Sequence, residues 1–124
     1  MATAEPADDE VLSLRVVEAM FAIPGRESAA LLPELMAIFL REESARLVEI
    51  PRLAAARRGP ELARAAHQLG GGCAVVGATQ LQRAAIALED AARAGNWPDI
   101  ADRLALVQGG WVRLQAVLAR RGLA

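Results

Sequence analysis

Apolar residues recur along most of this 124-residue chain at alternating spacings of three and four positions, the repeat that places side chains on one face of an α-helix. Two runs keep this spacing without a gap: Leu62, Ala66, Leu69, Cys73 and Val76, then Ile100, Leu104, Val107, Trp111, Leu114 and Leu118. Two further runs have helical spacing: Leu32, Leu35, Met36, Phe39, Leu40, Leu47 and Ile50, then Leu81, Ala84, Ala85, Leu88 and Ala92. Helices with one apolar stripe and short connections bury those stripes most simply in an antiparallel bundle.

Breaks between the runs set the expected boundaries. Residues 1–8 look like a mobile tail, and a short helix runs from the acidic Asp8–Glu10 segment to about Phe21. IPGRES interrupts it, with Ser28 as the expected N-cap of a long second helix. Pro51 is expected to kink or interrupt that helix, Gly59 to stop it, and Pro60 to begin the next. The GA pair at 77–78 and the AGNWPD segment end the third and fourth helices, and Gly109 and Gly110 weaken the fifth. We therefore predict an all-α protein, an antiparallel four-helix bundle with an additional short N-terminal helix, in one domain over residues 9–122.

Composition excludes several classes of function. The 14 basic residues are all arginine and stand against 15 acids, so the net charge of -1 offers no basic surface for nucleic acid or an anionic membrane. The polar start resembles no signal peptide and no apolar run could span a membrane, so we expect a cytoplasmic protein. One histidine and one cysteine cannot build a histidine and cysteine metal site, and we expect no metal.

The stretch AAHQLGGGCAVVGA, residues 65–78, holds that histidine, that cysteine and three consecutive glycines. A helix could end at the glycines and leave an extended segment, or it could continue through them. The unbroken apolar spacing favours continuation, although three glycines in a helix interior cost about 3 kcal/mol relative to alanine. A helix that keeps glycine at this cost is expected to need positions without a side chain there.

His67 is the residue that these glycines would leave accessible. At about 100° per residue it points about 140° away from the apolar stripe, toward solvent. The residues predicted on its side of the helix are small: Ala63, Gly70, Gly71 and Ala74. An ordinary surface histidine is the simplest alternative, but a generic exposed face would carry larger polar side chains. The chemistry open to an exposed imidazole is proton transfer, or nucleophilic attack with a covalent intermediate.

The stretch AHQLGGGCAVVGATQLQRAAIALE resembles the signature of histidine-containing phosphotransfer (HPt) domains, approximately A-H-x-L-K-G-S-x-x-x-x-G-A-x-x-L followed by a helix that closes on L-E. LLPELMAIFLREESARL is similar to the preceding helix of that family, so the resemblance covers about residues 11–120. It implies that His67 takes a phosphoryl group from the phospho-aspartate of one receiver domain and passes it to another. The implied partners are response-regulator receiver domains and a hybrid histidine kinase. The chain would need no cofactor, since Mg²⁺ belongs to the receiver, and it would be a phosphocarrier without autokinase activity.

The resemblance also implies roles for residues around His67. Glu89 stands where the family often has Glu or Gln beside the histidine. It would orient the imidazole, unless it is simply a solvated carboxylate on the helix surface. Residues expected to contact the phosphoryl group or the receiver are Arg64, Gln68, Gly70, Gly71, Ala74 and Arg93.

Position 70 departs from the pattern, because the usual lysine is glycine here and the chain has no lysine. Arg64 or Arg93 would substitute, or transfer would be slow, or the protein would be a docking module that binds a receiver or kinase without phosphorylation. We expect a monomer, since five helices can close one bundle, while a dimer through the second helix stays open as an alternative.

Overall fold

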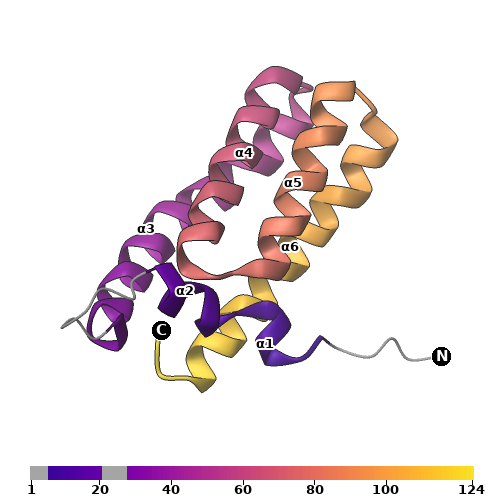
Figure 1. Cartoon of the computed structure of the whole chain (residues 1–124). Coiled ribbons are helices and arrows are strands. Elements are labelled where there is room, and N and C mark those ends of the chain that lie inside the picture. Colours follow the sequence, from indigo (N-terminus) through magenta and orange to yellow (C-terminus); the bar gives the residue numbers. More distant parts are fainter. Residues whose placement is uncertain (1–5, 21–27) are drawn as a thin grey trace.

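The computed structural model describes residues 6–20 and 28–124, which form helices without strands (Figure 1). Two short helices, α1 (Asp8–Val11) and α2 (Leu14–Met20), precede four long ones: α3 (Ser28–Ala55), α4 (Gly59–Val76), α5 (Thr79–Ala94) and α6 (Trp97–Arg120). The long helices run antiparallel to their chain neighbours and are joined by short turns. The predicted fold class, an all-α four-helix bundle, is confirmed.

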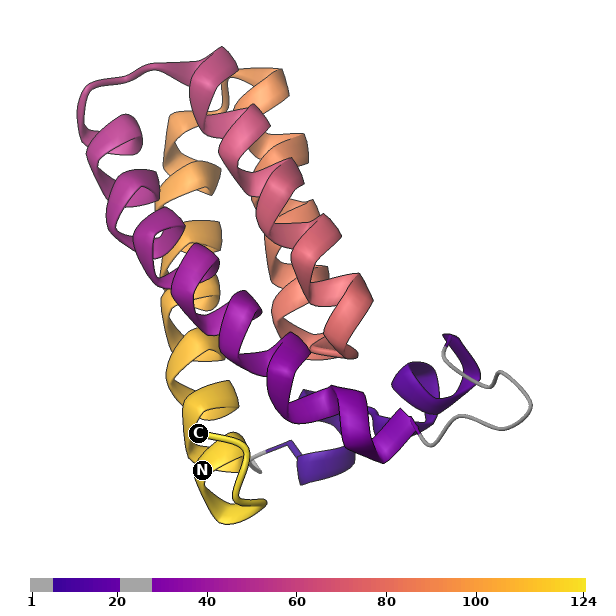
Figure 2. The same ribbon diagram turned by 90° about the vertical axis from the view of Figure 1, so that its left-hand side faces the viewer.

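The four long helices follow one another around the bundle, and α6 closes the ring against α3 (Figures 1 and 2). Helices α4 and α6 therefore lie diagonally across the core. Most members of the predicted apolar stripes are buried in it, among them Leu62, Leu69, Leu88, Val107 and Leu114, none more than 2% exposed. Burial of these side chains drives the packing, at about 25 cal/mol per Å² of apolar surface removed from water.

The N-terminal segment differs from the single helix that we predicted to about Phe21. The helix starts at Asp8, but it is divided after Val11, where Leu12 is extended and fully buried. Ser13 donates its backbone N–H to the carbonyl of Gly77 at 2.8 Å, so a tertiary hydrogen bond replaces a helical one. Phe21, most of IPGRES and residues 1–5 of the expected tail lie outside the described residues.

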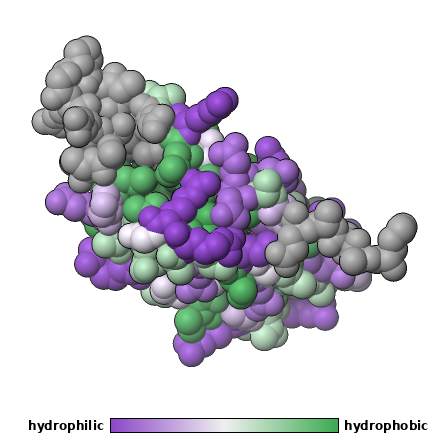
Figure 3. All heavy atoms as spheres, turned by 90° about the horizontal axis from the view of Figure 1, so that it is seen from below, coloured by the Kyte–Doolittle hydropathy of each residue, from purple (hydrophilic) through white to green (hydrophobic). Residues whose placement is uncertain are grey.

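Further contacts hold α1 across the lower end of the bundle. The Thr79 hydroxyl donates to the carbonyl of Glu10 at 2.6 Å, and the Arg120 guanidinium donates to both oxygens of Asp8. The Arg120 hydrogen bond outweighs a small opposing desolvation and lowers the pKa of Asp8. In the view from below, hydrophobic and hydrophilic residues lie side by side on this end of the molecule (Figure 3).

The connection between α3 and α4 also differs from prediction. Pro51 does not interrupt α3, which continues to Ala55, and the neighbouring Ile50 is fully buried. The helix ends before Gly59, which is instead the first residue of α4, with Pro60 near the N-terminus as predicted. Arg57 takes the left-handed conformation (φ 55°) expected of a glycine, and its guanidinium lies 5.0 Å from the centre of the Trp97 ring. This cation–π contact stabilises arginine at position 57, where the left-handed conformation would otherwise favour glycine.

The predicted continuation of the helix through the three glycines is confirmed, because α4 spans residues 59–76 without a break. Gly77 (φ 75°) and Gly95 (φ 66°) end α4 and α5 in the left-handed conformation that glycine adopts without strain. No helix in the described parts of the chain is long and apolar enough to cross a membrane.

Candidate functional site

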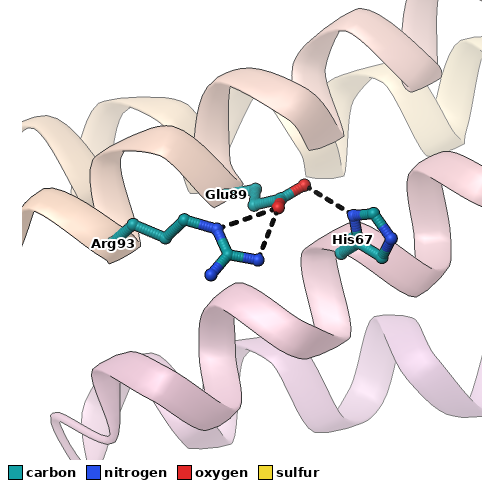
Figure 4. Close-up of polar contacts among 3 residues, drawn as sticks. All are labelled: His67, Glu89 and Arg93. Carbon is teal, nitrogen blue, oxygen red and sulfur yellow. Dashed lines mark hydrogen bonds and ion pairs between the residues drawn. The ribbon is translucent and has the colours of Figure 1, made fainter.

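His67 lies on the outer face of α4 beside α5, and its side chain is 71% exposed. Its Nδ1 is 3.1 Å from Oε1 of Glu89, a residue of α5 whose side chain is only 15% exposed (Figure 4). A neutral imidazole that donates from Nδ1 carries its lone pair on Nε2. Figure 4 shows the ring edge with Nε2 turned away from Glu89. The arrangement therefore suits a nucleophile at Nε2.

The Glu89 carboxylate is itself held by a residue one turn along α5. Arg93 donates to Oε2 from Nε at 3.0 Å and from a terminal nitrogen at 2.8 Å, which leaves Oε1 for His67. Partial burial of Glu89 disfavours its charge, but hydrogen bonds from Arg93 and His67 together outweigh this and lower the pKa of Glu89. Glu89 is thus an ionised, positioned acceptor for the imidazole.

Arg64 and Arg93 share a surface depression with His67. Its volume is about 400 Å³, and its lining is completed by Pro60 and Ala63. Two guanidiniums and an imidazole thus border one open space, and the Glu89 carboxylate is bonded to two of these groups, those of Arg93 and His67. Guanidiniums bind the oxygens of phosphoryl groups through charge-assisted hydrogen bonds, so this depression can accommodate such a group beside the ring.

The small residues around His67 are less uniformly exposed than we predicted. Ala63 and Gly70 are buried, and a Cβ on Gly70 would lie 3.8 Å from the Cβ of Ala85. Gly70 therefore faces α5, which corrects its expected place in an open patch, and Ala63 is buried although it borders the depression beside His67. Gly71 is exposed with nothing within 4 Å of the Cβ position, and Ala74 is half-buried. The open backbone beside the histidine is therefore centred on Gly71.

Gly72 and Gln68 lie on the side of α4 that faces α3. A Cβ on Gly72 would lie 2.9 Å from Oε2 of Glu43, a carboxylate in a residue that is 2% exposed. Glu43 accepts from Nε of Arg46 at 2.6 Å, and Arg46 donates from Nη1 to the side-chain oxygen of Gln68, also at 2.6 Å. Gln68, predicted to contact the phosphoryl group or the receiver, is exposed and is tied to α3 through Arg46.

Our sequence analysis missed the role of Glu43 and Arg46. The sequence does indicate that Glu43 is buried, because its position falls on the apolar stripe of the helix between Phe39 and Leu47. A carboxylate at such a position predicts a buried, paired charge.

The remaining side chains of interest near the site are the possible metal ligands and the thiol. No cluster of three or more metal-ligating side chains occurs within residues 6–20 and 28–124. Cys73 is fully buried, and burial, with a smaller effect of the Glu43 charge, raises the pKa of its thiol well above the ordinary range. The exposed nucleophile of the site is the imidazole.

Comparison with known proteins gives one result. The family model described as the Hpt domain matches residues 34–120, which include the whole of the described site. No curated protein and no solved structure matches the chain.

Proposed function

Because the chain belongs to the Hpt domain family, whose members act in phosphorelay signalling by histidine phosphotransfer, we propose that His67 is the residue that carries the phosphoryl group. The observation that supports this most directly is the exposed imidazole whose Nδ1 is bonded to a positioned carboxylate. That contact leaves Nε2 as the nucleophile.

In the proposed step, the Nε2 lone pair attacks the phosphorus of a receiver's aspartyl phosphate. The N–P bond forms while the bond between phosphorus and the aspartate oxygen breaks, and the bond electrons leave with the receiver's carboxylate. The ring becomes a cation that keeps its proton on Nδ1, and the Glu89 charge 3.1 Å away stabilises that cation. Attack on His67 phosphorus by the aspartate of a second receiver reverses these changes. Mg²⁺ is a ligand of the receiver, and no step assigns it to this chain.

Arg64 and Arg93 supply the positive charge that lysine usually supplies at position 70. Both line the depression next to His67 and meet phosphoryl oxygens during transfer. Gly71 and Ala74 keep the surface low so that a recessed aspartate can approach. Gln68, which is exposed, is a contact at the edge of this surface, whereas the buried Gly70 contributes indirectly, by letting α4 pack against α5 beneath it.

The proposed partners are response-regulator receiver domains, with a hybrid histidine kinase as the source of the phosphoryl group and a cytoplasmic site of action. Hpt domains interact with receivers as a family, and the site has the exposure that such docking needs. The absence of lysine at position 70 favours one second candidate, a docking module that binds a receiver without taking the phosphoryl group.

Transfer from a radiolabelled, phosphorylated receiver separates the two candidates. A relay gives an acid-labile label on the wild type and none on His67→Gln. Arg93→Gln and Arg64→Gln should each slow labelling by about tenfold or more if they replace the lysine. A wild type that binds the receiver with the same affinity as His67→Gln and takes no label would contradict the relay and support the docking module.

A further inference from the structure

Side chains from both neighbouring helices hold two consecutive residues on the outer face of α4. On the α5 side, the Glu89 carboxylate is bonded to His67. On the α3 side, Glu43 accepts from Arg46, and Arg46 donates to Gln68, with both donor–acceptor distances at 2.6 Å. The α5 contact belongs to the proposed phosphoryl site, whereas the α3 contacts have no part in the phosphoryl step.

The ion pair on the α3 side is largely buried. The Glu43 side chain is 3% exposed and that of Arg46 is 21% exposed. A buried ion pair contributes little net stability, because the loss of hydration of two charges offsets most of their attraction. Room for the Glu43 carboxylate also requires glycine at position 72, where alanine would make a more stable helix. Stability alone therefore does not explain why this pair is present.

The contact with Arg46 determines which group of Gln68 faces outward. A guanidinium has only donors, so it binds the Gln68 side chain at the oxygen, Oε1. The amide nitrogen then carries two N–H donors, and none of the residues that the structure describes accepts from it. Gln68 is exposed, so these donors are open to a partner molecule. A side chain that could turn either end outward is thus fixed with its donor end free.

The position of Gln68 places these donors inside any surface that covers His67. The Cα atoms of consecutive residues are about 3.8 Å apart. A protein that covers His67 with a standard interface, about 800 Å² on each partner, therefore also covers Gln68. The amide lies on the α3 side of α4 and the imidazole on the α5 side. The amide is thus placed to contact the partner protein beside its reacting group, not the phosphoryl group itself.

On the basis of the proposed function, in which a receiver docks over His67, we infer that Gln68 donates its amide N–H groups to a carbonyl or carboxylate oxygen of the receiver. Arg46 and Glu43 are the positioning residues for this contact. The Arg46 charge at Oε1 polarises the amide and strengthens it as a donor. An oxygen on the receiver is therefore favoured opposite Gln68, and a donor group there is disfavoured. The contact determines which receivers bind and how tightly, and it leaves the transfer step to His67.

Gln68→Glu tests the donor, because the new carboxylate keeps an oxygen for Arg46 and loses both N–H groups. The probe is the purified receiver domain, out of several, that binds the wild type most tightly. Calorimetry gives its dissociation constant, and labelling at increasing receiver concentration gives the half-saturating concentration and the rate at saturation. Both concentrations should rise about tenfold or more, because an acceptor then faces an acceptor, while the rate at saturation should change less than about twofold.

The matched control is Gln115→Glu. It makes the same substitution at an exposed residue of α6, the helix diagonally opposite α4, and should change none of the three quantities. Any effect of the added negative charge alone would appear in this variant too.

A second set of variants tests the positioning. Glu43→Leu combined with Arg46→Met removes both charges together, so no buried charge is left unpaired. Gln68→Ala should weaken receiver binding about fivefold in the wild type but less than about twofold in this double variant, where the amide is no longer oriented. Circular dichroism checks that every variant is folded.

The outcomes separate this contact from the relay itself. A labelled wild type whose half-saturating concentration is unchanged in Gln68→Glu would overturn the inferred contact and leave the relay intact. An equal loss on Gln68→Ala with and without the Glu43–Arg46 pair would overturn the positioning roles. A wild type that takes no label, while Gln68→Glu still weakens receiver binding, would contradict the relay and support the contact.

Discussion

Adding one methyl group to each of the glycines at positions 70–72 should have a different effect at each position, because the three sites face different surroundings. Alanine in a helix interior is about 1 kcal/mol more stable than glycine. At Gly71 nothing lies within 4 Å of the new Cβ, so Gly71→Ala should gain this full amount. At Gly70 the new Cβ meets Ala85 and Ile86 at ordinary distances of 3.8 and 3.9 Å, so Gly70→Ala should gain at least as much.

Gly72→Ala should not raise the free energy of unfolding. Its Cβ would lie 2.9 Å from Oε2 of Glu43, which therefore has to move. The Glu43 side chain is 3% exposed and bonded to Arg46 at 2.6 Å, so movement weakens a hydrogen-bonded ion pair in a packed site. Strain of this kind costs about 1–3 kcal/mol, which cancels or exceeds the helix-propensity gain.

Urea unfolding followed by circular dichroism at 222 nm measures these differences. Gly71→Ala should exceed Gly72→Ala in free energy of unfolding by about 1–3 kcal/mol, and its melting temperature should rise by about 4 °C. A Glu43→Ala change made in both the wild type and Gly72→Ala forms the control cycle, since removing the carboxylate removes the clash. Equal stabilities for Gly71→Ala and Gly72→Ala would refute the assignment of Gly72 to the Glu43 contact.

Further predictions concern the same site and its supports. Gly71→Ala should slow phosphoryl transfer several-fold although it stabilises the fold, and an unchanged rate would show that the open backbone is not needed. Because folding lowers the pKa of Glu89, its charge stabilises the folded protein at pH values above the ordinary pKa of 4.5, and this stability is lost as the pH falls through the lower pKa of the folded state. Glu89→Gln should therefore make the unfolding free energy less dependent on pH in the acid range, and it should slow the labelling of His67. Cys73 should resist thiol reagents in the native state and react in urea, and rapid native labelling would contradict its burial. Asn96→Ala should lower the unfolding free energy by about 1 kcal/mol, because the Asn96 side chain accepts from the N–H of Asp99.

Local patterning accounts for most of the fold that we predicted. Helical periodicity and the GP, GA and AGNWPD breaks depend on residues within a few positions of one another, so they can be read along the chain. The continuation of α4 through three glycines followed from phase alone, and so did the exposure of His67. Both properties belong to one helix and need no knowledge of its neighbours.

Contacts between distant residues account for what we predicted wrongly or missed. The hydrogen bond from Ser13 to Gly77 divides the N-terminal helix, and the Trp97 ring holds Arg57 where a glycine was expected. The Glu43 carboxylate explains why position 72 is bare, and this depends on how α3 packs on α4.

The site combines both kinds of information. A helical stripe places His67 on an outer face, but only the relative register of α4 and α5 brings its Nδ1 to 3.1 Å from Glu89, a residue 22 positions away. That register depends on how alanine and glycine let the two backbones approach, as Gly70 does against Ala85. Spacing within one helix fixes the direction of a side chain, whereas the distance between two helices depends on the packing of the whole core.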